Sequence, residues 1–224
     1  MPQHHVRDTA WGILDFDDHA GFVLVQQRWH YNWLLWPGVL SAWTLHEKQR
    51  FHATVDREIW DAWSYKIKLS VMGGSPIAQR LHGHDIRMNF DVKWTLSPPW
   101  DWTVNAYKMP PGTAPRSLHV SQVIASNKTI ELDTSDLQPR GAANQANAAT
   151  ANFRTPPHEF GHSIISGNAT ANPDEYLNSS PNLGDTSSIM NIGRDLRKRH
   201  LTAVIAELDK MIPELTFSIV APAL

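Results

Sequence analysis

The sequence predicts an α+β fold: a twisted mixed β-sheet with a backing helix, a second helix that carries functional residues, and a C-terminal helix. Three observations predict this class. A capped, amphipathic helical pattern covers residues 44–63, short alternating segments follow it as far as residue 132, and two more helical patterns come after residue 155. Because a helix with one apolar stripe is stable when that stripe is buried, we expect the first helix to pack on the sheet.

The helix over residues 44–63 has both a start signal and an apolar face. Thr44 and Glu47 are spaced as in a capping box, in which each side chain caps the backbone N–H of the other. The apolar stripe repeats at every fourth position, at Phe51, Val55, Ile59 and Trp63. The pattern therefore predicts a helix of about five turns that buries one side.

Strand candidates are short apolar or alternating segments between glycine and proline turns. They cover residues 21–25, 65–72, 86–96, 102–107, 118–124 and 129–132, and an aromatic run over 29–36 ends at the turn pair Pro37-Gly38. Residues 1–20 are polar, and we expect them to be irregular. Residues 133–152 are rich in alanine and asparagine, and we expect a connection that leads over the sheet to the next helix.

One domain is expected over residues 1–224, because a chain of this length can bury a substantial core. Its parts are an N-terminal extension and strand region (1–43), the first helix and the sheet (44–155), and the two later helices with the turn between them (156–224). The closing helix is expected from Leu201 to Met211, where apolar residues recur at helical spacing. The basic residues before it, Arg194, Arg197, Lys198 and Arg199, are interpreted as a solvated face.

Charge and composition exclude several classes of function. A net charge of −2 with a pI near 6.6 gives no electrostatic reason to expect nucleic acid or an anionic membrane as a partner. No apolar run approaches the roughly 18 residues of a membrane-spanning helix. The start lacks the apolar core of a signal peptide, which predicts a cytoplasmic protein or one secreted by a non-classical route. Without cysteine, any metal site must use His, Asp or Glu.

Tryptophan is unusually frequent, and the tryptophans lie within the range 1–102. Their usual role is to pack cores and interfaces. Stacking on sugars is the second use that we consider for them.

Residues 156–165 carry the pattern His-Glu-x-x-His. In a helix, His158 and His162 lie one above the other on the same face, so both imidazoles can bind one metal ion. Zinc would need a third protein ligand and would lower the pKa of a bound water to about 7, and Glu159 could act on that water as general base. Proline is tolerated in a first helical turn, and Gly167 is a plausible C-terminal stop. The alternative is a helix whose histidines pair with water or a carboxylate.

Downstream segments strengthen the zinc interpretation. Asn172-Pro173-Asp174-Glu175-Tyr176 follows the helix, and then comes Ser188-Ile189-Met190. Together these segments resemble zincin metallopeptidases of the metzincin side, and in detail the immune inhibitor A type of bacterial peptidase. The resemblance covers about residues 156–200 and implies a zincin-like catalytic domain, with Asp174 as the third zinc ligand and Met190 in a methionine turn beneath the metal.

Two departures from the family pattern leave roles open. The acidic segment arrives later in the chain than the family pattern expects, as if 166–171 were inserted, so the third ligand could also be Glu175, with Asp185 and His200 as outside alternatives. The tyrosine that often follows the methionine turn is replaced by Asn191-Ile192-Gly193. Transition-state stabilisation would then come from elsewhere, and Tyr176 and His200 are the candidates.

The sequence thus predicts a zinc-dependent endopeptidase that acts on protein or peptide substrates. The first alternative is a zinc hydrolase for peptidoglycan cross-links, with tryptophans lining a glycan groove. The second is a zinc-binding module without activity. A bacterial effector or toxin would fit the small size and the missing signal. Its partner would be a delivery or inhibitor protein, which the sequence does not identify.

Overall fold

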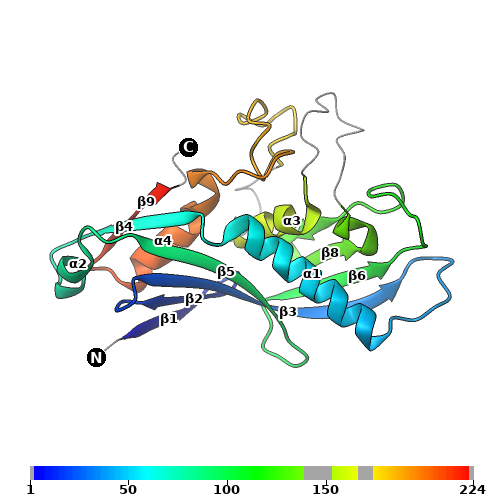
Figure 1. Cartoon of the computed structure of the whole chain (residues 1–224), viewed down its shortest axis with the longest axis horizontal. Coiled ribbons are helices and arrows are strands. Elements are labelled where there is room, and N and C mark those ends of the chain that lie inside the picture. The colour runs from blue at the N-terminus through cyan, green and yellow to red at the C-terminus, as the bar shows by residue number, and fades with distance from the viewer. Residues whose placement is uncertain (1–2, 139–152, 166–173, 222–224) are drawn as a thin grey trace.

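A nine-stranded mixed β-sheet forms the centre of the molecule, with helices packed on it (Figure 1). The computed structural model describes residues 3–138, 153–165 and 174–221. Along the sheet the strand order is β7-β8-β6-β3-β5-β4-β9, and the hairpin β1-β2 joins it through β3. The expected α+β class with a twisted mixed sheet is therefore correct.

The elements have the following bounds. The strands are β1 (His4–Asp8), β2 (Ile13–Asp17), β3 (Phe22–Leu35), β4 (Ile67–Met72), β5 (Ile86–Trp94), β6 (Trp102–Lys108), β7 (Gln122–Ile124), β8 (Thr129–Asp133) and β9 (Thr216–Ala221). The α-helices are α1 (Leu45–Trp63), α2 (Pro76–Leu81), α3 (Thr155–Ile165) and α4 (Thr202–Met211). Short 3₁₀ turns cover Ala125–Asn127, Thr134–Leu137 and Lys198–Leu201.

Strand β3 organises the sheet. It pairs in parallel with β5 along its first half and with β6 along its second half, while β2 pairs antiparallel with the first half on the other edge. The two segments expected at 21–25 and 29–36 are thus one strand. Between them Gln27 points into the core, where its Oε1 accepts hydrogen bonds from the Trp29 indole and the Ser163 hydroxyl.

Several expectations about the strands and helices were wrong or incomplete. The segment 1–20 is not irregular, because β1 and β2 form a hairpin in which Leu14 and Phe16 are fully buried while their neighbours are more exposed. Buried and exposed residues alternate along such a strand, so its overall composition is polar although one of its faces is buried. The helix α2 and the strand β9 were not predicted, and the segment 118–124 forms only the short strand β7.

Helix α1 begins where the sequence predicts. The capping box is present, with Thr44 and Glu47 each bonded to the backbone of the other, and the predicted stripe is buried. Tyr31 on β3 packs edge-on against Phe51 of α1, and Gln27 contacts Ser163 of α3. Because side chains alternate along a strand, the odd-numbered residues of β3 face both helices and the even-numbered residues face the opposite side.

The segment over residues 174–197 has almost no regular structure and rises above α3 in Figure 1. An isolated bridge joins Ser188 to Asp195, and α4 follows, packed beside β9. In the part of the chain that is described, no helix combines the length and apolarity needed to cross a membrane.

Candidate metal centre

Helix α3 presents two imidazoles on one side, as its sequence predicts. His158 is buried, and its Nδ1 lies 2.8 Å from the carbonyl oxygen of Ile189. A carbonyl oxygen only accepts hydrogen bonds, so Nδ1 must carry a proton. In the neutral ring the other nitrogen, Nε2, then offers a lone pair, which is the arrangement that a histidine metal ligand adopts.

Three possible ligand atoms converge at the end of these rings. Asp174 Oδ1 lies 2.9 Å from His158 Nε2 and 3.0 Å from His162 Nε2, and the two Nε2 atoms are 3.1 Å apart. Ligands at the usual distance from a tetrahedral zinc ion are about 3.3 Å from one another. These three residues therefore form a group that could hold a metal ion.

The charge of Asp174 fits such a site. Burial raises the pKa of this carboxyl, but its contacts with His158 and His162 outweigh burial and hold the pKa well below its ordinary value. Asp174 is therefore ionised at neutral pH. One cation shared by the three atoms would satisfy all of them at once.

Glu159 lies beside the first histidine and is buried, with 5% of its surface exposed. Burial raises the pKa of its carboxyl above the ordinary value. Within the described part of the chain its carboxylate makes no hydrogen bond, so it is not committed to another group. A carboxylate in this state is a stronger base than a solvated one.

Met190 packs directly under α3. A Cβ atom placed on Gly161 would lie 2.3 Å from Met190 Sδ and 3.0 Å from Cζ2 of Trp63 at the end of α1. The Trp63 indole also donates a 3.0 Å hydrogen bond to the carbonyl of Pro157. Glycine at position 161 thus lets Met190 and α1 approach the helix closely, and the neighbouring Ile189 carbonyl reaches His158.

The other three residues considered as third ligand belong to a separate, ionic network. Arg199 holds the Glu175 carboxylate through two hydrogen bonds of 2.6 and 2.9 Å. Arg197 binds the Asp185 carboxylate in the same bidentate way, through two hydrogen bonds of 2.8 Å each. Burial raises the pKa of Glu175, but Arg199 and His200 outweigh it and lower this pKa to about 2. Both carboxylates are therefore occupied by arginine.

This network corrects two interpretations. Arg194 and Lys198 are exposed as expected, but Arg197 is buried and Arg199 half-buried, because the acidic residues that neutralise them come from the preceding loop. His200 is buried, its Nδ1 accepts from the Arg197 backbone N–H, and its Nε2 lies 3.3 Å from Glu175 and from Ser188. Neither ring nitrogen is left for a substrate, which argues against His200 as a transition-state stabiliser.

Backbone contacts join the Asp174 segment to the Met190 segment. The Glu175 N–H donates to the Met190 carbonyl at 2.9 Å, and the Asn191 side chain donates to the Glu175 carbonyl. The same asparagine side chain donates to the carbonyls of Asn182 and Leu183. The position of Asp174 is thus set by the residues around Met190, although the two segments are well separated in the sequence.

Tyr176 stacks on His158, with ring centroids 6.0 Å apart, and the Arg116 guanidinium lies 6.0 Å from its ring. Burial raises the pKa of Tyr176, and the nearby Asp174 carboxylate raises it further. Its phenol is therefore neutral and can donate a hydrogen bond close to the three converging atoms.

Some features of this site had no sequence signal. The Ile189 carbonyl is a backbone group that any residue could supply, and Arg116 lies in a loop far ahead of α3 in the chain. The expected helix stop at Gly167 lies outside the described residues, as does most of the connection expected over 133–152.

Comparison of the chain with protein-family models, with curated proteins and with solved structures finds no match.

Proposed function

We propose that the protein is a zinc-dependent endopeptidase. The observation that carries the proposal is the convergence of His158 Nε2, His162 Nε2 and Asp174 Oδ1 within 3.1 Å, with the uncommitted carboxylate of Glu159 beside them. The resemblance of residues 156–200 to metzincin peptidases supports the same assignment. His158, His162 and Asp174 would hold the ion, and Met190 would pack beneath them.

In this proposal the metal ion and two side chains of the protein share the chemistry. Bound zinc would polarise the scissile carbonyl and make a water molecule acidic enough to react at neutral pH. Glu159 takes the proton of that water and later passes it to the leaving amine. Tyr176 donates its phenolic hydrogen to the carbonyl oxygen as negative charge develops there.

The sheet offers a place for an extended substrate. Among the described residues, β7 is the last strand on its side of the sheet and contacts α3, so the edge that β8 does not pair can accept main-chain hydrogen bonds. A peptide added there would run past the metal centre. Recognition through the backbone would allow many sequences to bind, with preferences set by side chains next to the site.

A single mass-spectrometry experiment tests the proposal. A diverse peptide pool is incubated with the zinc-loaded wild type, with the wild type plus chelator, and with Glu159→Gln. New cleavage products should form with the wild type alone, while Glu159→Gln should still bind zinc. Cleavage by Glu159→Gln at the wild-type rate would refute its role as base. If zinc-loaded wild type gives no products, the endopeptidase assignment fails, and isolated cell-wall sacculi become the next substrate.

A further inference from the structure

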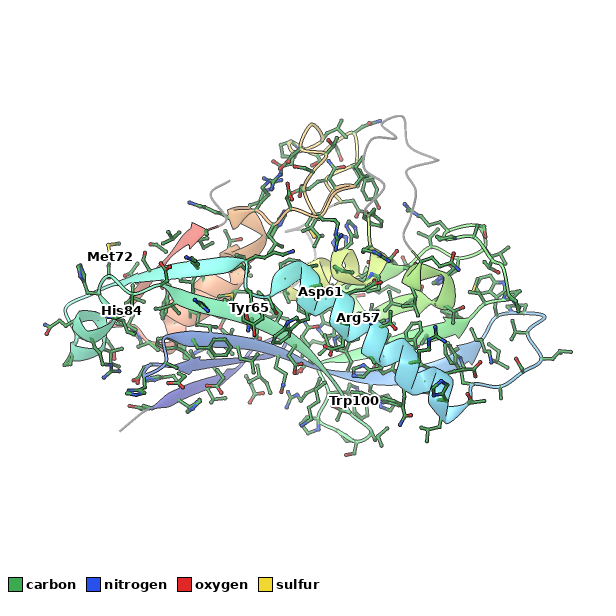
Figure 2. The ribbon with its side chains drawn as sticks, viewed as in Figure 1. Arg57, Asp61, Tyr65, Met72, His84 and Trp100 are labelled. Atoms are coloured by element: carbon green, nitrogen blue, oxygen red, sulfur yellow. The ribbon has the colours of Figure 1, made fainter. Side chains whose placement is uncertain are left out.

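An open cleft lies on the side of the sheet opposite α3. It has a volume of about 410 Å³ and is lined by Trp100, Asp101, Thr103, Ser126, Asn127 and Lys128. Figure 2 labels Trp100 on the connection between β5 and β6, which hangs beneath β3 in this view, whereas the 174–197 segment lies at the top of the molecule. The cleft is therefore remote from the metal centre.

The side-chain alternation of β3 and β6 independently places the cleft on that face. Tyr31 packs against α1, so its neighbour His30 points to the other side, where it stacks on Trp100. Thr103 stands between the fully packed Trp102 and Val104 and likewise points away from the helices.

Trp100 is a supported aromatic platform. The His30 ring lies nearly parallel to it, with centroids 4.4 Å apart and 20° between the planes, and 38% of Trp100 is exposed. His30 does not line the cleft, so another part of the indole does. A half-exposed indole fixed in this way offers a flat apolar surface to a ligand at little entropic cost.

Of the two charged residues at the cleft, Asp101 is neutralised by an arginine, and Lys128 is held by a backbone carbonyl. Arg28 donates to both carboxylate oxygens of Asp101, at 2.7 and 3.1 Å. The Lys128 ammonium donates to the carbonyl of Ala10. The lining therefore carries one cation beside uncharged donors and acceptors, and both kinds of group can bond to the hydroxyls of a polar, uncharged ligand.

Uncharged polar groups surround the indole. Within the described residues, the side chains of Thr103, Ser126 and Asn127 make no hydrogen bond to protein, so their donors and acceptors are free for a ligand. Further along β6, on the same face as Thr103, Asn105 accepts a 3.0 Å hydrogen bond from Asn32 and keeps its own amide N–H groups. This row extends the polar surface beyond the cleft.

We infer that this cleft binds a neutral oligosaccharide. A pyranose ring has one side of C–H groups, which packs on the Trp100 indole, and a rim of hydroxyls that exchange hydrogen bonds with Thr103, Ser126 and Asn127. The row towards Asn105 has room for a second sugar unit. The assignment is independent of the peptidase proposal, because it uses no residue of the metal centre.

Isothermal titration calorimetry with cellotetraose, chitotetraose, xylotetraose and mannotetraose tests the inference, in chelator so that zinc chemistry plays no part. The wild type should bind at least one of them saturably. Trp100→Ala should weaken that binding at least tenfold, and Thr103→Val or Asn127→Ala should weaken it several-fold. Tyr65→Ala is the matched control, because Tyr65 is an exposed aromatic residue at the far end of α1, and it should leave binding unchanged.

Three results would overturn the inference. They are no binding of any of the four tetrasaccharides by folded wild type, equal binding by folded Trp100→Ala, and binding of a sulfated tetrasaccharide alone. Circular dichroism of each variant shows whether it has folded.

Discussion

Replacement of Gly161 by alanine tests how the candidate metal centre is supported by the residues packed beneath α3. The added Cβ would lie 2.3 Å from Met190 Sδ, whereas carbon and sulfur atoms in contact are normally more than about 3.5 Å apart. Met190 must therefore move by more than about 1 Å inside a filled core. Overpacking of this kind costs about 1–3 kcal/mol, and alanine recovers about 1 kcal/mol through its better helix propensity. Because the overlap is severe, we expect the upper end of that range, a net loss of about 2 kcal/mol.

Urea unfolding in chelator measures this loss, which corresponds to a decrease in Tm of about 4–8 °C for a chain of this size. Gly184→Ala is the matched control, because nothing lies within 4 Å of its added Cβ, and it should be neutral or slightly stabilising. In a Met190→Ala background, Gly161→Ala should cost less than half as much. If Gly161→Ala is as stable as the wild type, the close contact between α3 and Met190 does not exist.

The same substitution should also weaken metal binding. Met190 follows Ile189, whose carbonyl orients His158, so a displaced Met190 shifts that carbonyl. Loss of such an orienting contact typically costs about 10–100-fold in metal affinity. Competition with a chromophoric chelator measures the zinc affinity, and an affinity equal to that of the wild type would mean that the Ile189 contact is not needed.

Three further predictions concern other parts of the molecule. Zinc at a hundredfold excess over its Kd should stabilise the wild type by about 2.7 kcal/mol in thermal unfolding. An equal stabilisation of Asp174→Asn would mean that Asp174 is not a zinc ligand. Hydrogen bonds from Arg197 lower the pKa of Asp185, so its stabilising effect is full above the ordinary pKa of 3.8 and is lost as the pH falls below it. Asp185→Asn should therefore cost about 2 kcal/mol at neutral pH and progressively less at acidic pH in urea titrations, and a constant loss would contradict the ionic role. Thr44→Ala should cost about 1 kcal/mol by the same method, and no loss would mean that the capping box does not stabilise α1.

Local patterns in the sequence were sufficient for α1, α3, α4 and most strands. The capping box at Thr44 and the apolar repeat after it are contained within single segments, and so is the spacing of His158 and His162. Elements with weak local signals were missed. In the hairpin β1-β2 the buried residues alternate with acidic ones, so no continuous apolar segment marks it. Strand β9 depends on pairing with β4, which lies far earlier in the chain.

By itself the sequence determined that two histidines and a glutamate share one helix, because about 3.6 residues per turn fixes their relative positions. Only the tertiary structure decided which acidic residue meets them. Asp174 and Glu175 are adjacent and chemically alike, but Arg199 binds Glu175, and the Met190 segment holds the backbone so that Asp174 faces the histidines. That choice depends on contacts between residues far apart in the chain, which no local pattern encodes.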